Sequence, residues 1–117
     1  IVNSEDGLDE ISPYAKTNIV QLKYGKITQF SVNPEEININ AIGFENLIGE
    51  NVKFNAAKMI NIFNGEDNDF SKAVCLNSAA GLVVSEKINN FEEAYIKCRE
   101  HILSGKTMSH IKKIQNV

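Results

Sequence analysis

The side chains in this sequence whose types and spacing could do chemistry are the carboxylates of residues 6–10, above all the adjacent Asp9 and Glu10. Two carboxylates about 5 Å apart repel by roughly 3 kcal/mol at an effective dielectric of 20, so an enclosed site keeps both ionised only beside a cation. Oxygen ligands favour a hard ion, and Mg²⁺ typically takes one or two protein carboxylates together with waters and phosphate oxygens. The pair is therefore a candidate magnesium site, and a solvated acidic turn is the alternative.

The backbone that carries the two acids is expected to be irregular. Successive side chains of a regular strand point to opposite faces, so Asp9 and Glu10 either serve one site from a kinked loop or address two ions. Gly7 supplies conformational freedom just upstream, and Pro13 biases the preceding residue away from helical angles. Residues 1–3 read as the end of a strand. The sequence thus predicts a strand that runs into an irregular acidic loop.

Length and composition limit the possible classes of protein. The chain has 117 residues, 43% of them hydrophobic and 23% charged, which suits one folded domain or part of one. The net charge of −3 gives no cationic field, so nucleic acid is not an expected partner. No apolar stretch approaches the ~20 residues that span a bilayer, so we expect a cytoplasmic protein without a membrane segment. The chain begins at Ile1 without Met, and we interpret it as a portion of a longer protein.

The remaining polar residues offer little chemistry. Cys75 and Cys98 lie in helical patterns without metal-ligand spacing, so we expect free thiols packed as small hydrophobes. His101 and His110 have no acid or nucleophile at a defined spacing and are expected to be structural. Asn77 lies among apolar neighbours and needs hydrogen-bond partners if it is buried, so we expect it to bridge to a neighbouring loop.

A β-hairpin is predicted from residues 18–24 and 27–32, which flank Gly25. A three-residue loop over residues 24–26 would gather the apolar side chains on one face, with Gly25 in a left-handed conformation. The predicted cross-strand pairs are Leu22 with Thr28 and Val20 with Phe30.

Helices are predicted for the rest of the chain. A short helical turn follows the N-cap Asn33 and Pro34, and longer helices are predicted over 51–64, 69–86 and 90–105, with an amphipathic segment over 108–114. The helix over 90–105 is expected to begin with a capping box at Asn90. We expect Asp69 or Ser71 to cap the second long helix, which is apolar nearly all round and should be central. The stripes expected to face the core are Ala56, Met59, Ile60 and Phe63 in the first long helix, and Phe91, Ala94, Tyr95, Cys98 and Ile102 in the third. The fold class is α/β, with a β-hairpin and a cluster of about four helices.

Residues 1–12, IVNSEDGLDEIS, resemble the stretch around the HGxxGLDE motif of the anthranilate phosphoribosyltransferase family of tryptophan biosynthesis. The later pieces agree in order: the hairpin, NPEE at 33–36, NAA at 55–57 and LNSAAGL at 76–82. The sequence departs from the motif at Asn3 and Ser4, where the family usually has His and Gly. The resemblance implies that residues 1–117 are the C-terminal part of the glycosyltransferase α/β domain. The family's N-terminal helical domain, its phosphate-binding GTGGD loop and its KHGN segment would lie before Ile1.

The resemblance also implies an activity and its residues. The family transfers the phosphoribosyl group from phosphoribosyl diphosphate (PRPP) to the amine of anthranilate and releases diphosphate. By this resemblance Asp9 and Glu10 are ligands of a Mg²⁺ ion that meets the diphosphate, and Asn3, Asp6 and Gly7 belong to the substrate-binding loop. A homodimer through the N-terminal domain is expected, and the 117-residue piece alone is expected to be inactive.

Two alternatives stay open at this point. The first is a non-catalytic ligand-binding or structural relative on the same scaffold, which the departures at Asn3 and Ser4 favour. The second is a related nucleoside phosphorylase, which the GLDE block disfavours.

Overall fold

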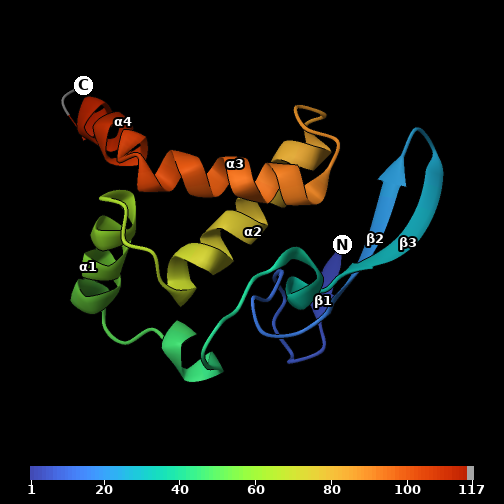
Figure 1. The fold of residues 1–117 in the computed structure, drawn as a ribbon, viewed down its shortest axis with the longest axis horizontal. Coiled ribbons are helices and arrows are strands. Elements are labelled where there is room, and N and C mark those ends of the chain that lie inside the picture. The colour runs from blue at the N-terminus through green and yellow to red at the C-terminus, as the bar shows by residue number, and fades with distance from the viewer. Residues whose placement is uncertain (116–117) are drawn as a thin grey trace.

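A small antiparallel sheet stands beside a cluster of helices in the computed structural model, which describes residues 1–115 (Figure 1). The sheet has the order β1-β2-β3, and the helical part consists of four α-helices and two 3₁₀ helices. The strands are β1 (Val2–Ser4), β2 (Thr17–Lys23) and β3 (Lys26–Val32); the helices are η1 (Pro34–Ile37), η2 (Phe44–Leu47), α1 (Val52–Phe63), α2 (Asp69–Val84), α3 (Phe91–Leu103) and α4 (Lys106–Gln115). The predicted α/β class with a hairpin and a four-helix cluster is confirmed.

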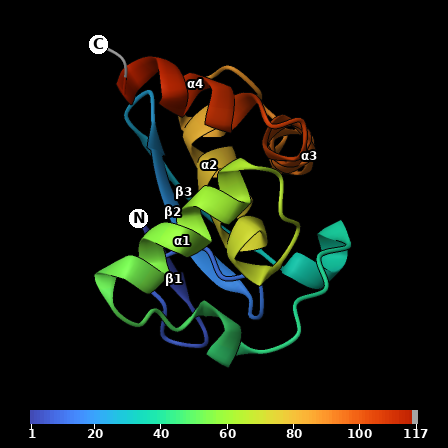
Figure 2. The ribbon, with the colours of Figure 1, turned by 90° about the vertical axis from the view of Figure 1, so that its left-hand side faces the viewer.

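The helix α2 is the central element, as predicted. It packs along α3, and α1 and α4 contact each other at the end of the cluster away from the sheet (Figure 2). From α2 the core takes Cys75, Leu76 and Ala79, all at most 1% exposed. The predicted stripe of α3 is also confirmed, because its residues are buried or partly buried against this core. Burial of these apolar faces is the main source of stability for the helical cluster.

Asparagine side chains begin the helices. Asn33, Asn51, Asn68 and Asn90 each accept a hydrogen bond from a backbone N–H in the first turn that follows. The caps at Asn33 and Asn90 were predicted, but the prediction that Asp69 or Ser71 caps α2 is wrong. Asn68 is the cap, and the Ser71 hydroxyl accepts from the Asn68 N–H at 2.9 Å in a reciprocal capping box.

The predicted core stripe of α1 is wrong except at Phe63, which is partly buried against the core. Met59 is 53% exposed and Ala56 and Ile60 are exposed too, whereas Ile62 is only 4% exposed and joins the core. Apolar residues occur on more than one side of this helix, so its periodicity does not decide which side is covered. The contacts of α1 with α2, α3 and α4 make that choice.

The predicted register of the hairpin is also wrong. Leu22 pairs with Ile27 and Val20 with Gln29, so the loop has two residues, Tyr24 and Gly25. Their φ angles of 50° and 75° are both positive, as a type I′ turn requires, and this turn matches the twist of the strands. The expected left-handed Gly25 is therefore correct, but the argument from a common apolar face is not.

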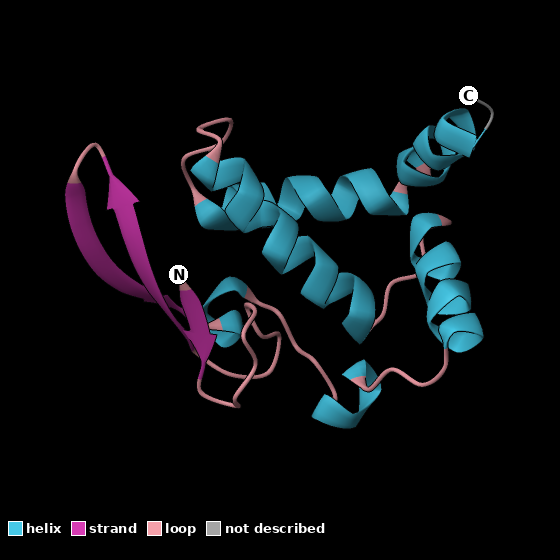
Figure 3. Cartoon of the chain, turned by 180° about the vertical axis from the view of Figure 1, so that it is seen from behind, coloured by secondary structure: helices cyan, strands magenta, loops and turns pink. Residues whose placement is uncertain are grey.

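The reason for the register lies in exposure. The outer half of the hairpin projects from the sheet (Figure 3) and touches the helical part through the bonds of Lys23 and Tyr24 to Glu86. Leu22 and Ile27 are 71% and 67% exposed. Since neither face of this half is buried, gathering apolar side chains on one face gains little. The turn geometry sets the pairing instead.

Candidate functional site

The acidic loop, residues 5–16, leaves the sheet at the end of β1 and returns to it at the start of β2. A tight turn forms at its beginning, where the Ser4 N–H donates to the Leu8 carbonyl at 3.0 Å and the Gly7 N–H donates to the Ser4 carbonyl at 3.0 Å. Gly7 has φ 93°, which is accessible to glycine and costly for other residues. The predicted strand and irregular loop are confirmed, and the acids lie on bent backbone.

Asp6 holds the loop in shape through hydrogen bonds within it. Its Oδ1 accepts from the Leu8 N–H at 3.2 Å, and its Oδ2 accepts from the Ser12 hydroxyl at 2.5 Å. Burial alone would raise the pKa of the Asp6 carboxyl, but the hydrogen bonds from Ser12, Ser4 and the backbone outweigh it and lower the pKa. Asp6 is therefore ionised at neutral pH and ties together the two ends of the segment that carries Asp9 and Glu10.

Asp9 and Glu10 both line one cavity of about 580 Å³ between the acidic loop and α2. Phe70, Ala73 and Val74 form much of its apolar wall. Both acids are exposed, and within residues 1–115 neither side chain forms an ion pair or a hydrogen bond. The two acidic residues thus border a shared space, and within residues 1–115 their side chains have no bonded partner.

The donor set suits a magnesium ion that also binds a substrate. The residues described contain no cluster of three or more His, Cys, Asp or Glu side chains that could hold a metal alone. Mg²⁺ is commonly held by one or two carboxylates, with waters and phosphate oxygens completing the octahedron. Asp9 and Glu10 fit such a shared site, in which an anionic ligand supplies the remaining oxygens.

Three residues expected at the substrate lie outside this cavity. Asn3 is exposed in β1, where it pairs with Asn18 of β2, and Asp6 and Gly7 form the turn before the acids. Asn3 therefore lies in the sheet at the base of the acidic loop, and not at the tip of the loop. Ser4, the second departure from the family motif, is only 2% exposed and lies under the loop.

Asn77 connects α2 to the acidic loop, as predicted. Its Oδ1 accepts from the Ile11 N–H at 2.9 Å, and its Nδ2 donates to the Ile11 carbonyl at 3.1 Å. The same Nδ2 donates to the Ala73 carbonyl one turn back at 2.9 Å. Both the oxygen and the nitrogen of this amide are thus engaged, so a polar side chain is accommodated beside the core.

A second anchor of the loop, at Asp69, was missed in the sequence. Its carboxylate accepts hydrogen bonds from the Tyr14 hydroxyl at 3.1 Å, the Ile42 N–H at 2.9 Å, the Asn46 amide at 3.0 Å and the Lys72 ammonium at 2.8 Å. Burial by itself would raise the pKa of the Asp69 carboxyl, but these donors outweigh it and hold the pKa well below its usual range. The i,i+3 spacing of Asp69 and Lys72 was the available sequence signal.

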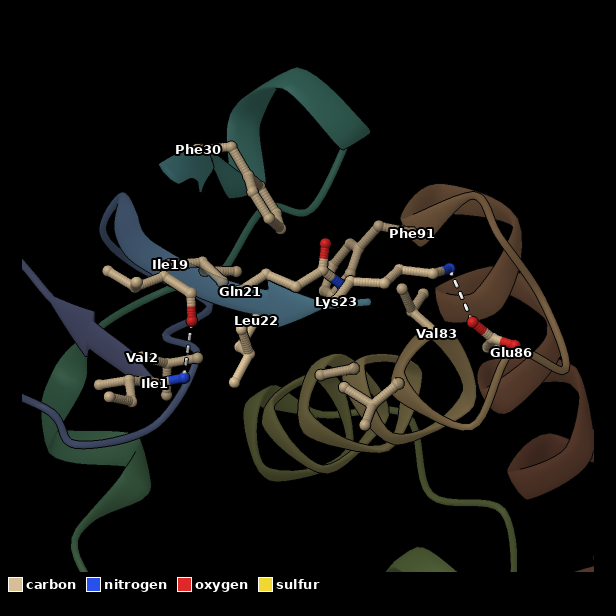
Figure 4. A pocket seen from close by; sticks show the side chains of 13 residues that line it. Ile1, Val2, Ile19, Gln21, Leu22, Lys23, Phe30, Val83, Glu86 and Phe91 are labelled. Carbon is tan, nitrogen blue, oxygen red and sulfur yellow. Dashed lines mark hydrogen bonds and ion pairs between the residues drawn. The ribbon is translucent and has the colours of Figure 1, made fainter. Parts of the chain in front are cut away.

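A second cavity, of about 300 Å³, lies between the hairpin and the ends of α2 and α3 (Figure 4). Its lining is largely apolar, from Ile19, Val83 and Phe91 among others. The acid at its rim, Glu86, is engaged by the Lys23 ammonium at 3.0 Å and the Tyr24 hydroxyl at 2.5 Å. This cavity presents no pair of uncommitted carboxylates, so the acidic loop is the stronger candidate.

The cysteines and histidines occupy ordinary structural positions. Cys75 and Cys98 are free thiols, as predicted, and burial raises the pKa of Cys75 to about 12, so it stays protonated. His101 and His110 are exposed on α3 and α4. No helix within the described part of the chain is long and apolar enough to cross a membrane.

The sheet, the helical cluster and the loop define part of an α/β domain that carries an acidic loop after a sheet strand. A family model described as the α/β domain of a glycosyl transferase family matches residues 1–108. The chain belongs to this glycosyl transferase family.

Its relatives include anthranilate phosphoribosyltransferases. The one from Pelagibacter ubique is 67% identical over 117 residues, which are 100% of this chain and 36% of the relative. The crystal structure of the Thermus thermophilus enzyme matches with a TM-score of 0.84 at 26% identity, over 96% of this chain and 33% of that one. The chain thus spans about a third of the length of these relatives, and the resemblance found in the sequence is confirmed.

About a third of the enzyme from Saccharomyces cerevisiae matches the fold of this chain in two complexes. Its structure with 4-fluoroanthranilate matches with a TM-score of 0.81 at 25% identity and covers 96% of this chain and 33% of that one. Its structure with PRPP and Mg matches with a TM-score of 0.81 at 24% identity, over 96% of this chain and 32% of that one, a likeness that concerns the fold.

Proposed function

We propose that this chain is the C-terminal part of the α/β domain of a magnesium-dependent anthranilate phosphoribosyltransferase. The 67% identity to the Pelagibacter ubique enzyme over all 117 residues supports this activity, as does membership of the glycosyl transferase family. The full-length protein would transfer the phosphoribosyl group from PRPP to anthranilate in the cytoplasm, as a homodimer formed through an N-terminal helical domain. The 117-residue piece would be inactive alone, because it spans only a third of the relatives' length.

The observation that carries the proposal is that Asp9 and Glu10 line one cavity and that their side chains have no bonded partner among residues 1–115. Two such carboxylates, left uncommitted by the fold, would hold one magnesium ion together with oxygens of the diphosphate. When bound, the ion would neutralise negative charge that develops on the departing diphosphate.

The neighbouring residues would support this pair. Gly7 permits the turn, and Asp6 holds the Leu8 N–H and the Ser12 hydroxyl on either side of the acids. Asn3, at the base of the loop, would contact the substrate from the sheet. Catalysis by this part of the chain then consists of binding and orienting the metal and the diphosphate, without a nucleophile or general base among these residues.

Replacing the carboxylates by amides in the full-length protein tests the proposal. We expect Asp9→Asn combined with Glu10→Gln to lower magnesium-supported turnover by at least roughly 100-fold, because an amide oxygen lacks the charge that holds the ion. Unfolding by urea should be unchanged, since both side chains are exposed. Glu93→Gln, an exposed acid on α3, is the matched control and should keep full turnover. Normal turnover in the double variant would refute the assigned role.

A second candidate is a relative that binds PRPP without transferring its phosphoribosyl group. The observation that favours it is the pair of departures at Asn3 and Ser4, where the family usually has His and Gly. Calorimetry of the full-length protein with PRPP and Mg²⁺, beside an assay of product formation, separates the two candidates. Binding without product supports the second, and turnover supports the first.

A further inference from the structure

The acidic loop has one hydrogen-bonded connection to the helices at the level of its acids. Within residues 1–115, Leu8 bonds to Asp6 and to Ser4 of β1, and the backbone of Asp9 and Glu10 forms no hydrogen bond. At Ile11, Asn77 of α2 takes both the N–H and the carbonyl. The bonds inside the loop fix its own shape but not its direction relative to α2. The amide of Asn77 supplies that direction.

The contact acts on the peptide group next to Glu10. The Ile11 N–H shares one planar peptide unit with the Glu10 carbonyl, so holding this N–H restricts rotation of the backbone at Glu10. The bond from Asn77 Nδ2 to the Ile11 carbonyl fixes the following peptide unit as well. Burial of the Ile11 side chain, which is 1% exposed, sets its position, and the amide sets the orientation of the chain around it.

The orientation of the amide is itself determined. Its Nδ2 faces two carbonyl oxygens, of Ile11 and Ala73, and its Oδ1 faces an N–H. Turning the amide over would oppose like groups at all three contacts. Asn77 also lines the cavity that Asp9 and Glu10 line.

We propose that Asn77 is a positioning residue that directs Asp9 and Glu10 toward a shared divalent cation by clamping the backbone of Ile11. This inference rests on the proposed function, since it assumes that the two acids bind the metal. It assigns to α2 the role of a rigid support, whose side chain orients the ligands without touching the ion. Groups that orient metal ligands in this way commonly affect metal affinity by roughly 10- to 100-fold.

The test measures metal binding in the full-length protein, with Mn²⁺ as a paramagnetic probe in the presence of PRPP. We expect Asn77→Ala to raise the dissociation constant of Mn²⁺ about tenfold, and to accelerate hydrogen exchange in the peptide containing residues 8–12. Asn90→Ala is the matched control, because it removes an asparagine-to-backbone bond of 2.8 Å at the start of α3. It should leave Mn²⁺ affinity and exchange in residues 8–12 unchanged.

Further variants separate this inference from the proposed function. If Asp9→Asn with Glu10→Gln abolishes Mn²⁺ binding while Asn77→Ala leaves it unchanged, the inference is overturned and the metal site stands. If the double variant binds Mn²⁺ normally, the proposed function fails instead. If Asn77→Ala does not fold, Asn77→Gln takes its place in the Mn²⁺-binding test. Its longer amide cannot meet both Ile11 groups in the same geometry, so we expect weaker Mn²⁺ binding, and unchanged binding in that folded variant would likewise overturn the inference.

Discussion

The Tyr14 hydroxyl donates a hydrogen bond of 3.1 Å to Oδ2 of Asp69 and so joins the acidic loop to the first turn of α2. The same carboxylate oxygen accepts from Ile42 and Asn46, and the other oxygen accepts from Lys72. Asp69 is only 5% exposed, and a buried carboxylate is tolerated only when its lone pairs are satisfied. One charged group therefore holds the acidic loop and the segment around η2 against the same helix.

Because the pKa of Asp69 is lowered, we expect the folded protein to lose stability in acid. Because its pKa is lowered in the folded protein, its contribution is present above the ordinary value of 3.8 and is lost as the pH falls below it. We expect Asp69→Asn to lower the free energy of unfolding by about 2–4 kcal/mol at neutral pH, since it removes a buried, paired charge. In urea unfolding, the free energy of unfolding of this variant should also fall less steeply below pH 3.8 than that of the unchanged protein. An equally steep fall would contradict the assignment.

The raised pKa values of the tyrosines lead us to expect that the folded protein also loses stability in alkali. Burial and the bond to Asp69 raise the pKa of Tyr14, burial raises that of Tyr95 to about 12, and the bond to Glu86 raises that of Tyr24. The folded protein therefore binds these protons more tightly than the unfolded chain, so stability should fall as the pH rises above about 10. Ultraviolet titration of the native protein should show no tyrosine ionising at the usual value of 10.0, whereas all three should do so in denaturant.

Removing the Tyr14 hydroxyl isolates one of these contributions. We expect Tyr14→Phe to cost about 1–2 kcal/mol of unfolding free energy near neutral pH, because the buried Asp69 loses a donor. The variant should lose stability less steeply in alkali. Asp69→Asn combined with Tyr14→Phe should cost less than the sum of the two, since the residues interact directly.

A pair of glycine substitutions tests the observed turn. Gly25 has φ 75° in the two-residue hairpin loop, so Gly25→Ala should lower the free energy of unfolding by about 1–2 kcal/mol. Gly81 lies inside α2 with open space around the position of an added Cβ, so Gly81→Ala should raise it by about 0.5–1 kcal/mol. The two changes add the same atom, and urea unfolding should give opposite signs. Equal signs would contradict the type I′ turn.

Removing the Ser12 hydroxyl tests how strongly the stability of the protein depends on hydrogen bonds within the acidic loop. Its buried hydroxyl donates to Asp6 and accepts from the backbone N–H groups of Tyr14 and Ala15. We expect Ser12→Ala to cost about 1–3 kcal/mol in thermal or urea unfolding, because it leaves these partners unsatisfied. Ser109→Ala removes an exposed hydroxyl on α4 and should change stability by less than about 0.5 kcal/mol.

Local chemistry made most of the elements predictable. The caps at Asn33 and Asn90, the left-handed Gly25 and the irregular acidic loop all follow from preferences that act within a few residues. The bridge from Asn77 was also predictable, since an amide among apolar neighbours must find partners. The pairing of Asp9 and Glu10 at one cavity agrees with the requirement for a kinked loop, and their role as metal ligands stays a prediction.

Most of the failures concern contacts between distant parts of the chain, whereas the missed cap of α2 is the local pair of Asn68 and Ser71. The stripe of α1 depends on where α2, α3 and α4 meet it, and its own sequence offers more than one apolar side. The hairpin register was argued from an apolar face that the fold leaves exposed. Asp69 was assigned to a cap because its sequence neighbours suit a helix start. Its true partners come from residues 14, 42 and 46, whose proximity no local pattern predicts.

The shared acceptor at Asp69 has a consequence for motion. The acidic loop and the segment around η2 are far apart in sequence, yet detaching either one would leave the buried charge with fewer donors and weaken its hold on the other. We therefore expect the two segments to open together, as a single cooperative unit, in native-state hydrogen exchange.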